Sequence, residues 1–294
     1  MTTQAPSAGG VAAGRTARLA GVRTRVLDEG AGPAVLLLHG NPDNADEWRG
    51  VIDRLASDHR CIAPDLPGYG TRGRTFDLPP TFDYGLPQQV QFVDDLLEAL
   101  AIDDVTLVVH DIGGIMGVPW AARNTARLRG VVYTNTVAFE FRWFPLARLW
   151  GSRRWQHRLR ARAMMGAMGL AGGALFRRGF AQQNPQLPDE QLDRFVRDFA
   201  CNPVAKATTL RQFATITARD FFADYADMLQ TIADAVETRT VWGDGDPYVP
   251  DARAEDLGAA TLRRLQGVGH WVPLLAADAV ADAVRRVERA PAGT

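Results

Sequence analysis

The sequence predicts an α/β fold in which a mostly parallel sheet is flanked by helices and carries an inserted helical cap. Strand-like and helix-like segments alternate in the first and last parts of the chain, which is the pattern of a parallel sheet covered by helices. Between them, a long stretch has helical patterns alone. We therefore expect a core formed by residues 15–137 and 225–290, a cap formed by residues 138–224, and a flexible tail at 1–14.

Local patterns predict the elements of the core. Apolar and β-branched runs predict strands, and apolar residues three and four positions apart predict helices. In one of these helices Val93, Leu96, Leu97 and Leu100 share a face. The expected strands are a pair within 17–28, then 34–38, 59–64, 105 to a bend at 111, 130–135, 238–242 and 261–265; the expected helices include 44–56, 88–100 and about 275–287.

The composition limits the possible functions. The 294 residues are 46% hydrophobic and carry a formal net charge of -1, and the charges are dispersed, so nothing indicates nucleic-acid binding. An arginine-rich stretch at 153–162 is interpreted as the solvated face of a helix, and binding to a membrane or an anionic partner is the less favoured alternative for it. Cys61 and Cys201 have no metal-binding or disulfide-framework spacing. The first residues lack a secretory pattern and no apolar run approaches a membrane span, so we expect a cytoplasmic protein without membrane contact.

The most informative feature is a bend that carries a carboxylate. The buried strand from Val105 breaks into a helix at Asp111, which is followed by Gly113 and Gly114. Such a strand-to-helix elbow usually holds a serine nucleophile in a G-x-S-x-G sequence. An ionised carboxylate can instead attack an sp3 carbon directly, and the resulting ester must be opened by water with the help of a base. The bend therefore indicates two-step chemistry at an sp3 carbon.

Three motifs occur in a fixed order over nearly the whole chain. They are H-G-N-P at 39–42, H-D-I-G-G at 110–114, and W-G-D-G-D-P at 242–247 followed by G-V-G-H at 267–270. With them the chain resembles the α/β-hydrolases that use an aspartate nucleophile. This group contains haloalkane dehalogenases, fluoroacetate dehalogenases and epoxide hydrolases, and the order nucleophile, acid, histidine is that of the α/β-hydrolase fold.

The resemblance implies a catalytic triad. Asp111 would be the nucleophile, His270 the general base that activates water, and Asp246 the acid that orients the imidazole. Asp244 is an alternative acid. Some relatives carry the acid after the preceding sheet strand, where this chain has Asn135, so the later loop is expected to supply it.

The resemblance also implies the groups that stabilise negative charge. The backbone N–H of Ile112 and one near Asn41 are expected to form the oxyanion site. In haloalkane dehalogenases the asparagine of H-G-N-P donates to the halide, and most members add a tryptophan directly after the nucleophile. Ile112 stands there in this chain, so a second donor would come from the cap. The cap candidates are Trp143, Trp150 and Trp155, each of which could equally serve in packing.

Other classes of hydrolase match this sequence less well. Epoxide hydrolases use cap tyrosines to protonate the departing oxygen, but Tyr225 lies only at the cap margin and Phe213 stands where relatives have a tyrosine. Fluoroacetate dehalogenases bind the substrate carboxylate with arginines, at positions that Ile112 and Ile115 occupy here. A serine-type esterase is disfavoured because the elbow has no serine. Trp271, beside the histidine, completes the expected pocket residues.

These observations favour a haloalkane dehalogenase-like hydrolase that acts on an apolar halogenated substrate. An epoxide hydrolase for a bulky substrate is the alternative, and a non-hydrolytic, ligand-binding relative is a lesser one. No metal or organic cofactor is implied. The expected partners are a small apolar organic substrate and water, and the oligomeric state is left open.

Overall fold

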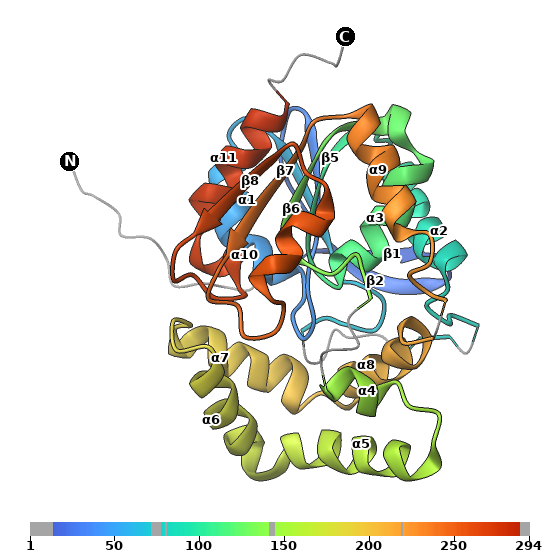
Figure 1. The fold of residues 1–294 in the computed structure, drawn as a ribbon, viewed down its shortest axis with the longest axis vertical. Coiled ribbons are helices and arrows are strands. Elements are labelled where there is room, and N and C mark those ends of the chain that lie inside the picture. Colours follow the sequence, from blue (N-terminus) through green and yellow to red (C-terminus); the bar gives the residue numbers. More distant parts are fainter. Residues whose placement is uncertain (1–13, 72–77, 80, 141–144, 219, 289–294) are drawn as a thin grey trace, which may run out of the picture.

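The structure is a computed structural model that describes residues 14–71, 78–79, 81–140, 145–218 and 220–288. Within these residues the strands are β1 (Arg15–Leu19), β2 (Val22–Gly30), β3 (Ala34–Leu38), β4 (Arg60–Pro64), β5 (Val105–Asp111), β6 (Leu128–Thr136), β7 (Thr238–Gly243) and β8 (Thr261–Leu265). They form one sheet of eight in the order β1-β2-β4-β3-β5-β6-β7-β8. β2 is antiparallel to β1 and β4, and all other pairs are parallel. The predicted α/β class with a mostly parallel sheet is confirmed (Figure 1).

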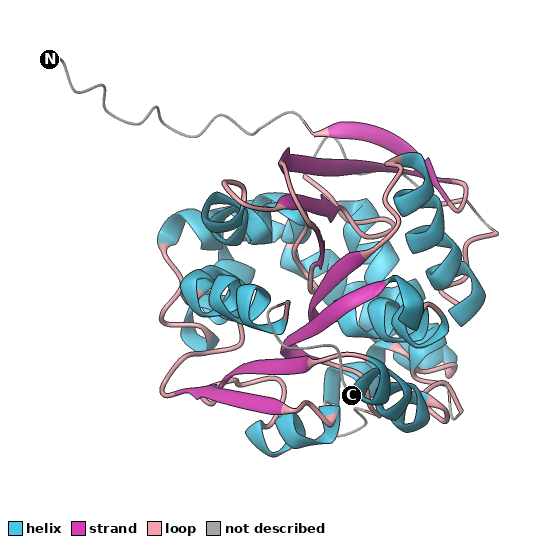
Figure 2. Cartoon of the chain, turned by 90° about the horizontal axis from the view of Figure 1, so that it is seen from above, coloured by secondary structure: helices cyan, strands magenta, loops and turns pink. Residues whose placement is uncertain are grey.

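The central strand β5 shows why the sheet is buried on both faces. Successive side chains of a strand point to opposite faces. Leu107 and Val109 belong to the core under α2 (Leu86–Ala99), α3 (Gly113–Arg123) and α9 (Tyr225–Ala235), whereas Val108 belongs to the core under α1 (Arg49–Leu55) and α11 (Ala277–Val287). Figure 2 shows the strands as a twisted layer between helices. Burial on both faces explains the unbroken apolar run of this strand.

A group of helices lies between β6 and β7 in the sequence and packs beneath the sheet in Figure 1. We call this group the cap. Its helices are α4 (Pro145–Trp150), α5 (Trp155–Met168), α6 (Ala174–Gln183), α7 (Asp189–Phe195) and α8 (Pro203–Ile216). The next helix, α9, packs instead against α3, on the sheet side of the molecule.

Several element boundaries differ from the prediction by a few residues, and three of these differences are described here. Ala20 and Gly21 both have positive φ (48 and 77), so β1 and β2 join through a tight two-residue turn. The two strands extend beyond the range 17–28 in which the pair was expected. The helix expected from residue 44 starts as a 3₁₀ turn, because the Asn44 side chain accepts a hydrogen bond from the Asp46 N–H. The last helix starts at Ala277, after the separate short helix α10 (Val272–Leu275).

In the described part of the chain, no helix combines the length and the apolar composition needed to cross a membrane.

Candidate active site

The strand β5 ends at Asp111 in a strained turn. Asp111 has φ 45, a left-handed conformation that is unfavourable for a residue with a side chain. The two following glycines make the turn possible, because a Cβ on Gly113 would collide with the Leu38 carbonyl oxygen and one on Gly114 with the Thr136 hydroxyl. That hydroxyl donates to the Asp111 carbonyl oxygen at 2.7 Å. Close packing at the two glycines and this hydrogen bond together hold the turn in place.

The structure brings Asp111, His270 and Asp246 together. His270 Nδ1 lies 2.7 Å from Asp246 Oδ2, and its Nε2 lies 3.7 Å from Asp111 Oδ2. Because a carboxylate can only accept a hydrogen bond, Nδ1 carries a proton, and in the neutral form of the imidazole Nε2 presents its lone pair toward Asp111. The 3.7 Å contact is too long for a direct hydrogen bond. In this tautomer His270 can take a proton at Nε2 from a molecule that enters between His270 and Asp111.

Asp246 is held by four hydrogen bonds. Its Oδ1 accepts from the Tyr248 and Val249 N–H groups at 2.7 and 3.0 Å, and its Oδ2 accepts from Asn135 Nδ2 at 2.8 Å as well as from His270. Burial alone would raise the pKa of Asp246, but the charge of His270 and these hydrogen bonds lower it below its ordinary value. The carboxylate therefore stays ionised beside the imidazole.

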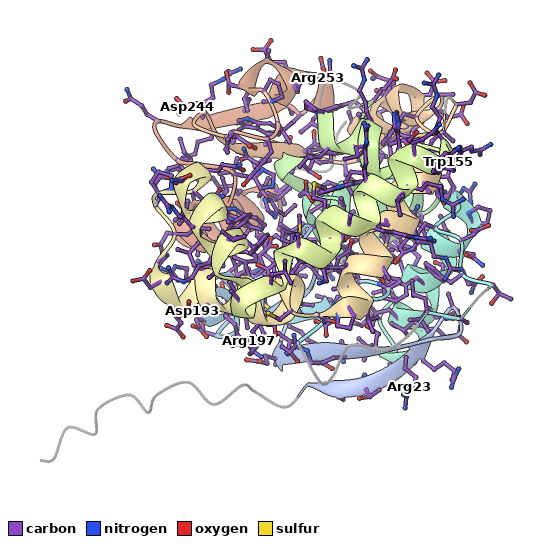
Figure 3. All side chains as sticks on the ribbon, turned by 90° about the horizontal axis from the view of Figure 1, so that it is seen from below. Arg23, Trp155, Asp193, Arg197, Asp244 and Arg253 are labelled. Atoms are coloured by element: carbon purple, nitrogen blue, oxygen red, sulfur yellow. The ribbon has the colours of Figure 1, made fainter. Side chains whose placement is uncertain are left out.

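Asp244, the alternative acid, lies elsewhere. Its Oδ1 accepts a hydrogen bond from the Gly267 N–H at 2.6 Å on the exposed side of the loop, and Figure 3 shows it at the rim of the molecule. It does not contact His270, which pairs with Asp246 instead.

The backbone N–H of Asn41 donates to Asp111 Oδ1 at 2.8 Å. The side chain of Asn41 lines the same cavity as Ile112, and Thr209 Oγ1 donates to the Asn41 amide oxygen at 3.3 Å. This contact turns the amide oxygen toward α8. The expected oxyanion residues thus lie beside the Asp111 carboxylate.

A buried ion pair lies directly beneath the elbow. His110 Nδ1 lies 2.7 Å from Glu47 Oε1, and both side chains are fully buried. Nε2 of His110 is 3.0 Å from the carbonyl oxygen of His270, and Glu47 Oε2 accepts from the Gly40 N–H at 3.1 Å. Burial opposes the charged imidazole, but Glu47 and Asp111 outweigh it and raise the pKa of His110 to about 9. Sequence reasoning missed Glu47 and its pairing with His110.

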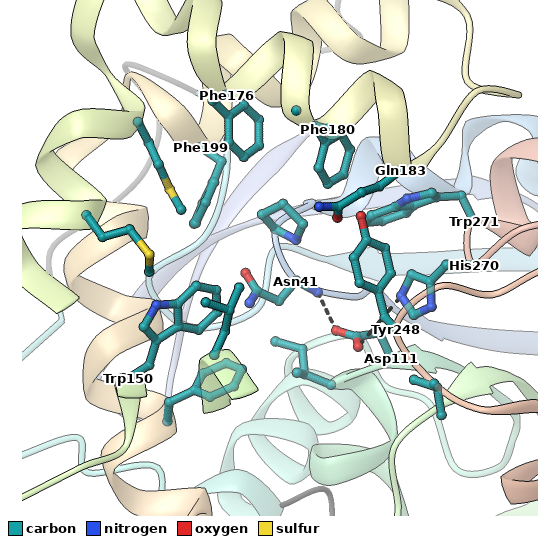
Figure 4. A pocket seen from close by; sticks show the side chains of 18 of the residues that line it. Asn41, Asp111, Trp150, Phe176, Phe180, Gln183, Phe199, Tyr248, His270 and Trp271 are labelled. Atoms are coloured by element: carbon teal, nitrogen blue, oxygen red, sulfur yellow. Dashed lines mark hydrogen bonds and ion pairs between the residues drawn. The ribbon is translucent and has the colours of Figure 1, made fainter. Parts of the chain in front are cut away.

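The Asp111 carboxylate faces a cavity of about 410 Å³ (Figure 4). Most of its lining is apolar and comes from both the sheet side and the cap, with Asn41, Asp111, Gln183, Tyr248 and His270 as the polar exceptions. The apolar lining includes Ile112, Ile115, Leu146, Trp150, Met164, Met168, Leu175, Phe176, Phe180, Phe199, Phe213 and Trp271. Such a cavity suits an apolar ligand with one reactive group near Asp111.

Three of the six expected pocket side chains line this cavity, namely Trp150, Phe213 and Trp271. Trp150 packs edge-on against Phe213 with ring centroids 5.1 Å apart. The indole N–H of Trp271 donates to Asn184 Oδ1 at 3.0 Å, so it is not directed at the substrate. The position of Trp143 lies outside the described residues.

The predictions that Trp155 and Tyr225 line the pocket are wrong. Trp155 is 70% exposed at the start of α5, on the outer side of the cap. Tyr225 begins α9, is 1% exposed, and donates its hydroxyl proton to the Ile115 carbonyl oxygen at 2.7 Å. It lines a separate cavity together with Ile216 and Leu229. Its position in the sequence, at the cap margin, could not reveal which of the two cavities it lines.

A tyrosine that sequence reasoning missed lines the cavity. Tyr248 comes two residues after Asp246, and its ring packs edge-on against His270 with centroids 5.1 Å apart. Its hydroxyl accepts a hydrogen bond from Asn184 Nδ2 at 2.7 Å. Burial raises the pKa of Tyr248 above its ordinary value, so the hydroxyl keeps its proton. Its position two residues after Asp246, the expected acid, could have indicated from the sequence that it lies near the site.

Comparison with known proteins supports the resemblance seen in the motifs. A cis-3-alkyl-4-alkyloxetan-2-one decarboxylase of Xanthomonas campestris pv. campestris is 41% identical over 125 residues, 40% of this chain and 42% of that protein. A haloalkane dehalogenase of Mesorhizobium japonicum is 41% identical over 113 residues, 38% of this chain and 35% of that protein. The aligned stretch is less than half of either relative.

Solved structures and a family model extend the likeness to most of the chain. The epoxide hydrolase CorEH matches with a TM-score of 0.74 at 20% identity, covering 93% of this chain and 97% of that one, which shows a common fold. A family model described as alpha/beta hydrolase fold matches residues 33–277. The resemblance expected from the motifs is confirmed, and the chain belongs to the alpha/beta hydrolase fold family.

Proposed function

We propose that this chain is a hydrolase that cleaves a carbon–halogen bond of an apolar substrate through an alkyl ester on Asp111. The observation that carries the proposal is the placement of this carboxylate against an apolar cavity, with His270 Nε2 3.7 Å away and paired through Nδ1 to Asp246. The haloalkane dehalogenase relative supports the same reaction.

In the first step a carboxylate oxygen of Asp111 attacks the sp3 carbon that bears the halogen. The new C–O bond forms as the carbon–halogen bond breaks, and the halide leaves with the electron pair. The apolar walls exclude water and strengthen the attraction between the developing halide and nearby hydrogen-bond donors. The side-chain amide of Asn41 is the first donor in this proposal, and the indole N–H of Trp150 is the second.

In the second step water opens the ester. His270 Nε2 takes a proton from water, and the resulting hydroxide adds to Cγ of Asp111. The backbone N–H groups of Asn41 and Ile112 stabilise the oxyanion of the tetrahedral intermediate. Asp246 stabilises the charged imidazole, which then returns the proton to the departing alcohol oxygen. The products are an alcohol, a halide ion and a proton, and Asp111 is regenerated.

Epoxide opening is a second candidate because of Tyr248. An alkoxide that leaves an epoxide carbon needs a proton, whereas a halide does not. Tyr248 lines the cavity, and its pKa lies above the ordinary value, so it can supply that proton. Tyr225 is no longer a candidate for this role, because it does not line this cavity and its hydroxyl donates to the backbone carbonyl oxygen of Ile115.

Steady-state turnover by Tyr248→Phe separates the two candidates. Bromoalkanes, alkyl epoxides and dialkyl oxetanones would be supplied as three substrate panels, with Asp111→Asn as the inactive control. If halide release is the function, Tyr248→Phe keeps bromoalkane turnover within about threefold, since no proton donor is needed in that step. Turnover of epoxides alone, lost in Tyr248→Phe, would reject the dehalogenase in favour of the second candidate.

A further inference from the structure

The cap helix α5 has apolar residues on two opposite faces. On the inner face Ala161 and Met165 are buried. On the outer face Trp155 and Leu159 are 70% and 61% exposed, and the exposed Ala163 continues their line at the same spacing of four residues. Residues four apart lie on one side of a helix, so these form a single outward stripe. Figure 3 looks onto this helix, with Trp155 at one end.

Two further exposed apolar side chains lie in the segments that follow α5. Leu170, in the turn after α5, and Leu175, in α6, are 61% and 68% exposed. Together with Trp155 and Leu159 they are the large hydrophobic side chains that stand exposed in the described part of the chain. We call these four residues the cap face. An exposed apolar group of this kind is typical of an interaction site.

The charged side chains of residues 141–188, which include the whole cap face, have one sign. Residues 141–188 contain nine arginines and no aspartate or glutamate. Five of these arginines flank the stripe and are exposed: Arg153, Arg154, Arg158, Arg160 and Arg162. None of the five forms an ion pair with a carboxylate of the described residues, whereas Arg177 and Arg194 in the same cap are paired. The expected solvated helix face is therefore apolar along its centre and basic along its edges.

The reactive cavity reaches the cap face. Leu175 is exposed to solvent and also lines the cavity that contains Asp111. Met164 and Met168, on the inner side of α5, line the same cavity. An apolar molecule that enters at Leu175 therefore meets apolar walls on its way to the nucleophile.

We propose that the cap face docks onto an anionic lipid bilayer, from which the apolar substrate enters the cavity. The identity of the substrate in this proposal rests on the proposed function, whereas the docking does not. A helix with an apolar stripe and flanking arginines lies in the plane of a membrane interface, where arginine stems cover apolar surface and their guanidinium groups meet lipid phosphates. A second copy of this face is disfavoured as the occupant, because its unpaired arginines would repel their equivalents.

Vesicle binding by the full chain tests the docking. Sedimentation with phosphatidylcholine vesicles would be compared with vesicles that also contain phosphatidylglycerol, and Trp155 emission would be followed at the same time. The other described tryptophans are at most 8% exposed, so a blue shift reports mainly on Trp155. We expect binding to the anionic vesicles alone, with a blue shift, and weaker binding as salt is raised. Trp155→Phe should still bind but lose the shift.

Paired variants give the control. Trp155→Ser with Leu159→Ser should abolish binding, and Arg158→Gln with Arg162→Gln should weaken it by about tenfold or more. Arg23→Gln with Arg286→Gln removes the same charge from exposed positions on β2 and α11 and should leave binding unchanged. Binding that ignores lipid charge, or that survives the serine pair, overturns the proposal. A dimer that the serine pair dissociates would assign the face to a second copy instead.

Two measurements separate this proposal from the proposed function. Asp111→Asn should bind anionic vesicles as well as the unaltered chain does, because Asp111 lies inside the cavity and is not part of the cap face. The serine pair should hydrolyse a water-dissolved bromoalkane at the unaltered rate. If the unaltered chain turns over bromoalkanes but does not bind anionic vesicles, the docking alone is rejected. If the unaltered chain binds these vesicles but does not turn over any of the substrates, the catalytic proposal alone is rejected.

Discussion

At the scale of single residues, Glu47 connects parts of the site that the motifs treat separately. One carboxylate oxygen faces His110, which precedes the nucleophile and contacts the backbone of His270. The other accepts from the Gly40 N–H, next to the Asn41 group that binds Asp111. A single buried side chain therefore fixes the relative positions of Asp111, His270 and the loop that carries Asn41.

Glu47→Gln should lower the free energy of unfolding by about 3 kcal/mol at neutral pH, because it leaves a buried imidazole without its counter-ion. The pKa of His110 is raised from 6.5 to about 9 in the folded chain. The stability from this proton is therefore complete below pH 6.5 and is lost as the pH rises through about 9. Urea unfolding from pH 6 to pH 10 should show the gap between the two proteins closing. A gap that does not change with pH would contradict a charged His110.

The sequence allowed some of these residues to be predicted and not others. Asp111 and His270 could be placed because each follows a strand in a motif with a fixed chain order. The partnership of Glu47 with His110 could not, since it depends on how a 3₁₀ turn packs against a strand far along the chain. Trp155 shows the same limit, because aromatic composition does not reveal which way a helix faces.

At the scale of elements, the β5–α3 elbow depends on the absence of side chains after Asp111. A methyl group at Gly113 would meet the backbone oxygen of Leu38 on the neighbouring strand β3, and backbone cannot move aside as a flexible side chain can. Gly166 in α5 has open space where its Cβ would lie. The alternation of strands and helices in the core could be predicted from the sequence, but this packing requirement is visible only in three dimensions.

Gly113→Ala should therefore destabilise the chain by about 2 kcal/mol or more and reduce turnover, through overpacking at the elbow. Gly166→Ala is the matched control and should change stability by no more than about 1 kcal/mol, in the stabilising direction, because alanine favours a helix. Denaturant midpoints of the two variants provide the comparison. Equal effects at both positions would count against the strained elbow.

At the scale of the whole molecule, one ion pair joins the cap to the loop that carries Asn41. Arg194 of α7 donates to both oxygens of Asp43, with Nη2 2.9 Å from Oδ2, and both side chains are buried. The substrate cavity lies between the same two parts. This contact therefore helps to set the cavity's shape.

Arg194→Gln should cost about 3 kcal/mol of folding stability, because it leaves the Asp43 carboxylate buried without a counter-ion. Adding Asp43→Asn should recover part of that loss, since the unpaired charge is then removed. Thermal and urea unfolding of the two single variants and the double variant measure this coupling. A double variant whose loss equals the sum of the single losses would show that the pair does not act as a unit.

Intact-protein mass spectrometry of His270→Gln tests the central claim most directly. Without its base the chain should still be alkylated at Asp111 but should not hydrolyse the ester, so the intermediate accumulates. We predict a mass increase equal to the alkyl group of a bromoalkane, absent when Asp111→Asn is added. An adduct with epoxides alone would move the assignment to epoxide opening. No adduct from bromoalkanes, epoxides or oxetanones would contradict the account and favour a non-hydrolytic, ligand-binding protein.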